Sequence, residues 1–265
     1  MTNVGPDYRR TVGLFVVLCL FALVYPVGMN AAPRDAVPSD PLDSSRWRYM
    51  VAQHFRDAEI VFDERVQVLV PAEAQDLFAT PVQIRAPALA DVTQIRVIAD
   101  ASAQSRVLDY FPVDAIAAIG FSFEVTQATP LRAAVRTADG VWHIGGAWVD
   151  AQGGGCAPPR LSVVDTVGGS SSTVVEARSW LRANGGQRLK VRIVLPEPAR
   201  ALDEITVRDV QGRVHARIVP GRPLAREPVF ALDIASRESL QIEARDSKGK
   251  RYRTNVAAAG NRAGP

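Results

Sequence analysis

The residue best suited to chemistry in this sequence is a cysteine, Cys156, in the stretch Gly153-Gly154-Gly155-Cys156-Ala157-Pro158-Pro159. Three glycines remove side-chain packing before the thiol, and two prolines give a stiff, extended exit after it. The composition therefore predicts a sulfur atom that reaches solvent on a flexible tether. Because an extended chain covers about 3.3–3.6 Å per residue, four residues move a thiol by roughly 13 Å. Such reach suits delivery of a bound group into a cleft of another protein.

The sequence around Cys156 holds no group that would activate the thiol. No acidic residue or histidine lies beside it, and Arg160 is the nearest charged residue. Reactive cysteines of enzymes usually have a histidine or positive charges close by. Activation would then come from the site of a partner protein, which indicates a carrier rather than an enzyme. A buried, inert thiol and an incidentally exposed thiol are the two alternatives.

The N-terminus predicts export from the cytoplasm. Arg9 and Arg10 precede an apolar run over Val12–Val24, and the small pair Ala31-Ala32 follows, so we interpret residues 1–32 as a signal peptide. The run is shorter than the roughly 20 residues that span a bilayer, although an uncleaved anchor is the alternative. We expect the mature protein in the periplasm. Cys19 would leave with the leader, and the one cysteine that remains cannot form an internal disulfide.

Charge and the ionisable residues argue against several kinds of site. The 31 Lys and Arg and 28 Asp and Glu residues are dispersed and give a net charge of +3. We therefore expect neither nucleic acid nor, after signal cleavage, a membrane as a partner. His54, His143 and His215 are isolated, so we expect core or exposed histidines, no metal centre and no other cofactor. Gly145-Gly146 predicts a β-bulge rather than a phosphate cradle, because no helix with Lys-Ser or Lys-Thr follows.

A short helix is predicted after a Pro-rich linker over residues 33–42. In residues 46–55 the apolar side chains of Trp47, Met50, Val51 and Phe55 recur at helical spacing, which is typical of a helix packed on a sheet. The tryptophans are expected in the core or at a domain interface rather than on a ligand platform. They are Trp47, Trp142, Trp148 and Trp180.

From residue 64 the apolar period changes to two, which predicts strands. The predicted strands are 66–70, 82–84, 95–99, 121–125, 131–137 and 141–149. Asp139-Gly140 between the last two indicates a hairpin. Short strands with frequent turn signals are typical of an immunoglobulin-like sandwich over about residues 58–150, within a first domain of residues 43–152.

The C-terminal part predicts a second, smaller sandwich over residues 187–256. Its alternating runs are 189–193, 204–208, 214–219, 229–234 and 240–244. Between the domains lies a Gly-rich arm and linker, residues 153–186, in which Thr173 and Glu176 form a capping box. We expect a helix there through Trp180 and Leu181 that stops at Asn184-Gly185-Gly186. The predicted fold class is all-β, with two immunoglobulin-like β-sandwich domains and a short N-terminal helix.

Several segments resemble the Sox sulfur-carrier families. Residues 131–142, 147–149 and 154–156 resemble the last hairpin and the carrier arm of SoxY, and 81–86, 95–100 and 108–112 resemble its earlier strands. Residues 205–208, 228–232 and 240–250 are similar to SoxZ. The similarity spans most of residues 43–254, in the order of the fused SoxYZ-like proteins associated with quinoprotein dehydrogenases.

The resemblance implies a sulfur-oxidation carrier rather than an enzyme. In that family the arm cysteine is loaded with a sulfur-containing group, for example one derived from thiosulfate, and presents it to periplasmic redox enzymes of cytochrome or quinoprotein type. By this resemblance Cys156 is the covalent carrier, and Gly153, Gly154 and Gly155 form the swinging arm. No catalytic residue is implied.

Two departures from the family bear on this interpretation. Free-standing SoxY ends just after its cysteine, whereas here the arm is tethered at both ends and its reach is shorter. The SoxZ-like part has no His-Pro loop between Leu195 and Asp203. A non-catalytic structural or interaction module of immunoglobulin type is the main alternative. A thiol oxidoreductase is disfavoured because no second cysteine is available to resolve a mixed disulfide.

Overall fold

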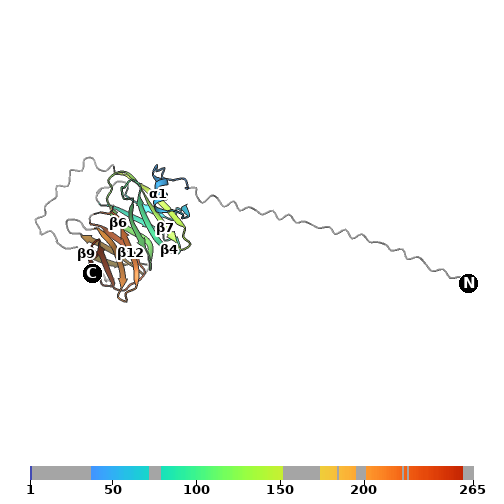
Figure 1. Cartoon of the computed structure of the whole chain (residues 1–265). Coiled ribbons are helices and arrows are strands. Elements are labelled where there is room, and N and C mark those ends of the chain that lie inside the picture. Colours follow the sequence, from blue (N-terminus) through green and yellow to red (C-terminus); the bar gives the residue numbers. More distant parts are fainter. Residues whose placement is uncertain are drawn as a thin grey trace. The chain divides into compact units, whose positions relative to one another are not determined.

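The computed structural model describes residue 1 and residues 37–71, 79–151, 174–183, 185–194, 201–222, 224–225 and 227–258 (Figure 1). The chain divides into the units Met1–Arg34 and Asp35–Pro265, and every element named below belongs to the second unit. No helix of the described residues combines the length and the apolar character needed to cross a membrane.

One helix and fifteen strands make up the described body. They are α1 (Trp47–His54), β1 (Ile60–Phe62), β2 (Gln67–Leu69), β3 (Thr80–Arg85), β4 (Val92–Ala99), β5 (Arg106–Phe111), β6 (Ala115–Phe123), β7 (Thr129–Thr137), β8 (Trp142–Val149), β9 (Val174–Leu181), β10 (Gln187–Val194), β11 (Leu202–Asp209), β12 (Val214–Pro220), β13 (Val229–Ile234), β14 (Leu240–Asp246) and β15 (Arg251–Val256). The predicted all-β class is confirmed.

The strands form two sheets around one main hydrophobic core. A nine-stranded sheet has the order β1-β8-β7-β4-β5-β12-β11-β14-β15, and a six-stranded sheet has the order β2-β3-β6-β13-β10-β9. Alternating side chains of both sheets point inward, as the period of two predicts. The core extends from β3 residues such as Ile84 to β14 residues such as Ile242, both fully buried.

Two seams join the parts of the sequence that predict separate domains. β5 pairs with β12, so that Tyr110 lies opposite Ile218, and β6 pairs with β13, so that Phe121 lies opposite Phe230. Both sheets therefore run from residues of the predicted first domain into residues of the predicted second one. The domain bounds 43–152, 153–186 and 187–256 stay a prediction.

The helix predicted from the capping box of Thr173 and Glu176 is wrong, because residues 174–181 form strand β9. Val175, Ala177, Ser179 and Leu181 alternate with more exposed neighbours, and Val175 and Ala177 pack against the main core. β-Branched residues and the period of two favour a strand paired with β10, and this burial outweighs a local capping signal.

Helix α1 confirms the predicted amphipathic helix packed on a sheet. Trp47 and Met50 are buried on its inner face, and Phe55 follows it. They meet Trp142 and Ile144 of β8 in a second hydrophobic cluster on the outer side of the nine-stranded sheet. Phe55 and Trp142 contact edge to face, with ring centroids 5.3 Å apart. The hairpin predicted at Asp139-Gly140 also forms, with Gly140 at φ +91°.

The bulge predicted at Gly145-Gly146 does not form. β7 and β8 pair in regular register there, with Ala133 opposite Gly145. The glycines instead allow a close approach of other segments. A Cβ atom on Gly145 would lie 1.9 Å from the carbonyl oxygen of Val66, in the connection between β1 and β2.

We expect Gly145→Ala to lower the free energy of unfolding by about 3 kcal/mol, because the backbone of Val66 must move to admit a methyl group. The matched control is Gly146→Ala, whose Cβ would lie 2.7 Å from Leu42 Cδ1, the end of a flexible side chain, and 3.1 Å from the carbonyl oxygen of Leu131, so we expect a smaller loss there. Urea unfolding of both variants measures the difference. An equal decrease in the free energy of unfolding for both variants would contradict the close approach of Val66 to Gly145.

Candidate functional site

The predicted carrier residues lie outside the described residues. These residues are Gly153, Gly154, Gly155 and Cys156. The described chain stops at Ala151 and resumes at Val174. The structure therefore bears on this site through the two strand ends that flank it, β8 and β9, and through the surfaces beside them.

Both flanking strand ends lie at the same end of the body. Val149, the last residue of β8, pairs with Thr129, which follows the β6–β7 connection. Val174 pairs with Val194, the last residue of β10. β10 pairs in turn with the start of β13, which lies beside the end of β6. Ala151 is half-buried and packs against the main core, so the first flank is fixed up to Ala151, two residues before the predicted arm.

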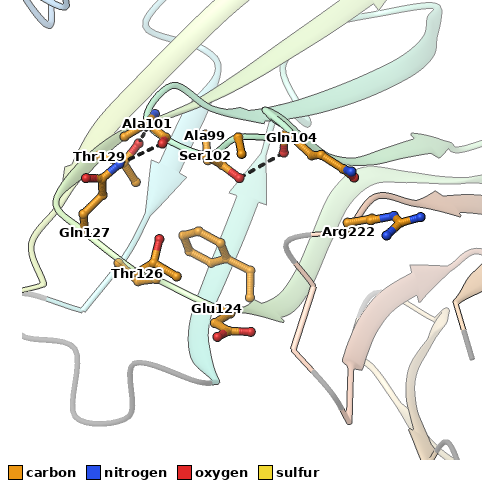
Figure 2. A pocket seen from close by; sticks show the side chains of 12 residues that line it. Ala99, Ala101, Ser102, Gln104, Glu124, Thr126, Gln127, Thr129 and Arg222 are labelled. Carbon is orange, nitrogen blue, oxygen red and sulfur yellow. Dashed lines mark hydrogen bonds between the residues drawn. The ribbon is translucent and has the colours of Figure 1, made fainter. Parts of the chain in front are cut away.

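An open pocket of about 240 Å³ lies at this end of the sheets (Figure 2). Its lining residues are Ala99, Ala101, Ser102, Ala103, Gln104, Phe123, Glu124, Val125, Thr126, Gln127, Thr129 and Arg222. Hydrogen bonds hold its rim: Gln127 Nε2 donates to Ala101 O at 2.8 Å, and Ala101 N donates to Thr129 Oγ1 at 2.9 Å. These described lining residues include no histidine or cysteine, so they offer groups for binding but no thiol or imidazole for catalysis.

Each of the three histidines contacts a different set of polar side chains. His54 Nε2 lies 2.7 Å from Ser105 Oγ. Burial, aided by the positive charge of Arg96, lowers the pKa of His54 to about 4, so its ring is neutral at neutral pH. His143 Nδ1 lies 2.8 Å from Asp63 Oδ2.

His215 is fully buried, which agrees with the core alternative of the prediction. Its ring lies between Asp209, 3.2 Å from Nε2, and Asp114, 3.1 Å from Nδ1. Among the described residues no group of three or more histidine, cysteine or acidic side chains could hold a metal ion. Each of these histidines contacts a nearby polar side chain.

A buried ion group under the N-terminal segment escaped the sequence analysis. The side chain of Arg132 in β7 is 1% exposed. Its guanidinium nitrogens lie 2.7 Å from a carboxylate oxygen of Asp40 and 2.9 Å from one of Asp100. Burial alone would raise the pKa of Asp40, but hydrogen bonds from Arg132 and from the backbone N–H groups of Ser44 and Leu42 lower it. The one available sequence signal was an arginine between apolar residues, with Leu131 before it and Ala133 to Val135 after it.

The tryptophans divide into two pairs. Trp47 and Trp142 are buried, in line with the predicted core or interface position. Trp148 and Trp180 are 52% and 48% exposed, so they are not core residues, and their position at a domain interface stays a prediction. Trp148 Nε1 donates to Leu42 O at 3.1 Å and thereby holds the segment before α1. Trp180 lies on β9, the strand that follows the segment of Cys156.

Residues 51–156 match the family model of the sulfur oxidation protein SoxY. The match begins in α1, includes β1 to β8 and ends at Cys156 itself. It supports a SoxY-like carrier protein of sulfur oxidation. SoxY proteins are carriers rather than catalysts and act in the periplasm, which agrees with the interpretation of the sequence. The match covers less than half of the chain and does not reach β9 to β15, so the SoxZ-like part stays a prediction.

No curated protein matches the chain. Two solved structures are distantly similar. A β-glycosidase from Bacteroides vulgatus shares 8% identity at a TM-score of 0.24, with 74% of this chain and 25% of that chain covered. A glycosyl hydrolase family 2 member from Bacteroides cellulosilyticus DSM 14838 shares 10% identity at a TM-score of 0.22, with 71% and 25% covered. The chain spans about a quarter of the length of these proteins, and TM-scores this low indicate nothing about function.

Proposed function

We propose that this protein is a periplasmic carrier that binds a sulfur-containing intermediate covalently on Cys156 and presents it to partner redox enzymes. The observation that supports this most strongly is the extent of the SoxY match, which runs up to Cys156. Cys156 is also the one cysteine outside the predicted leader. Gly153, Gly154 and Gly155 then serve as the swinging arm.

The chemistry of loading explains why such a carrier works with redox enzymes. Joining the Cys156 thiol to the outer sulfur of thiosulfate forms one S–S bond and releases one proton and two electrons. The carrier holds no redox group of its own in this proposal, so the partner must accept the two electrons. A partner of cytochrome or quinoprotein type can do so. The thiolate is the attacking form of cysteine, and the partner's site supplies its activation.

The described body supports the proposal by its two anchors. Ala151 and Val174 lie at one end of the sheets, so the segment between them starts and finishes on the same side of the body. Cargo on that segment is presented at this end, beside the β6–β7 connection. An arm tethered at both ends reaches less far than a free tail, which requires the partner's cleft to come close to this end.

Thiol accessibility tests the proposal. In a Cys19→Ser background, we expect 5,5′-dithiobis(2-nitrobenzoate) to modify Cys156 in the folded protein about as fast as in urea. A Cys156→Ser variant should give no reaction and unfold at the same temperature. If Cys156 reacts only after unfolding, the thiol is buried and the carrier proposal fails. If the protein is instead a structural module of immunoglobulin type, replacement of Cys156 by serine should not affect its function.

A further inference from the structure

The outer face of the six-stranded sheet has a positively charged strip on its last two strands. Arg178 and Trp180 of β9 and Arg188 and Lys190 of β10 form this strip, which we call the β9–β10 surface. The register places Arg178 directly opposite Lys190, and Trp180 directly opposite Arg188. Arg178, Trp180 and Lys190 are exposed.

The acidic residues around the β9–β10 surface are already engaged by other arginines. Asp233 of β13 accepts hydrogen bonds from both Arg188 and Arg182, at 2.8 Å and 2.7 Å. Glu176 and Glu227 both pair with Arg192.

Arg178 and Lys190 are thereby left as an unneutralised pair. Neither has an ion pair or hydrogen bond with another described residue. Like charges directly opposite one another on neighbouring strands repel and destabilise the pairing. The structure therefore maintains an unfavourable juxtaposition that a carboxylate placed between the two side chains would relieve.

Trp180 adds an apolar contact next to this charge pair. Its side chain is 48% exposed, and its indole N–H has no partner among the described residues, unlike that of Trp148. Tryptophan and arginine are the residue types most enriched where protein partners bind tightly. Trp180 lies two residues from Arg178, on the same face of β9.

The face of β9, rather than its edge, is the part available for docking. Ser179 Oγ on the inner side of β9 donates to Ala257 O at 3.3 Å, just after β15 ends. β9 also contacts β15. Addition of a further strand at this edge is therefore disfavoured, whereas the outward side chains are accessible.

We propose that the β9–β10 surface docks an acidic partner protein, which places a carboxylate between Arg178 and Lys190 and an apolar group against Trp180. The carboxylates of Asp233, Glu176 and Glu227 neutralise the neighbouring arginines, so the free positive charge is confined to Arg178 and Lys190 and offers no continuous track for a polyanion such as nucleic acid. A protein surface with discrete carboxylates fits between them. This surface does not involve Cys156, so Cys156→Ser leaves the docking unchanged.

The test uses a synthetic peptide in which glutamates flank one leucine, titrated calorimetrically into the whole mature protein at low salt. We expect the charge reversal Arg178→Glu with Lys190→Glu to weaken binding by at least about tenfold. The matched control is Arg48→Glu with Arg56→Glu, the same change of charge at two exposed arginines on and after α1, which should leave the affinity within about twofold.

Tryptophan fluorescence places the peptide on the strip. Peptide binding should change the emission of the wild type and of Trp148→Phe but not of Trp180→Phe. Three results would overturn the proposal: no binding of the peptide, equal weakening by the two charge reversals, or tighter binding of duplex DNA than of the peptide. The last result would assign the strip to nucleic acid.

Discussion

Replacement of Arg132 by alanine is expected to lower the free energy of unfolding by about 3–5 kcal/mol. The side chain is 1% exposed and lies between Asp40 and Asp100, whose side chains are 8% and 1% exposed. Its removal leaves two buried carboxylates without a counter-charge. It also removes the contact with Trp47, whose ring centre lies 4.4 Å from the guanidinium carbon.

The matched control for this substitution is Arg136→Ala. Arg136 lies four residues further along β7 and on the same face, but it is exposed. Its guanidinium carbon lies 5.9 Å from the ring centre of Trp142. We expect its loss to cost about 0.5–1 kcal/mol. Urea unfolding of the two variants gives the comparison. If both variants lost less than about 1 kcal/mol, the buried ion group would not hold the segment before α1 on the sheet.

The described body is expected to unfold in one cooperative transition, despite the prediction of two domains from the sequence. Ile84→Ala in β3 and Ile242→Ala in β14 should each lower the stability of that same transition by about 2–5 kcal/mol. Both side chains are fully buried in one core, although they lie in different predicted domains. The β5–β12 and β6–β13 seams join the two parts by backbone hydrogen bonds.

Scanning calorimetry measures this cooperativity. A calorimetric enthalpy equal to the van't Hoff enthalpy indicates a single transition. Leu69→Ala is the control, because this β2 side chain is 44% exposed and its loss should cost little. Two transitions, with Ile84→Ala shifting one and Ile242→Ala the other, would show two independently stable domains.

Local pattern was enough to predict most strands but not their partners. Alternation identified β3, β4 and β10 because one face of each is buried. β15 was missed because its residues from Arg251 to Asn255 are nearly all polar on both faces, so no apolar residues alternate with polar ones there. Pairing of β5 with β12 involves residues about a hundred positions apart, and no local pattern specifies such contacts.

The candidate site was predictable only in part. Cys156 could be found from its type and from its glycine neighbours alone, without any knowledge of the fold. The close approach at Gly145 and the strip around Trp180 could not, because each depends on which segment lies across from it. Arg178 and Lys190 are ordinary surface charges in the sequence, and only the register of β9 and β10 places them opposite one another.

The most direct measurement is the intact mass of the protein isolated from the periplasm of its host, with and without reductant. The account predicts added masses of sulfur-containing groups that reductant removes, and none on Cys156→Ser. Cys19 lies within the predicted leader, and the comparison with Cys156→Ser separates any addition on Cys19 from one on Cys156. An unmodified wild type under all conditions, or the same additions on Cys156→Ser, would contradict the carrier role of Cys156.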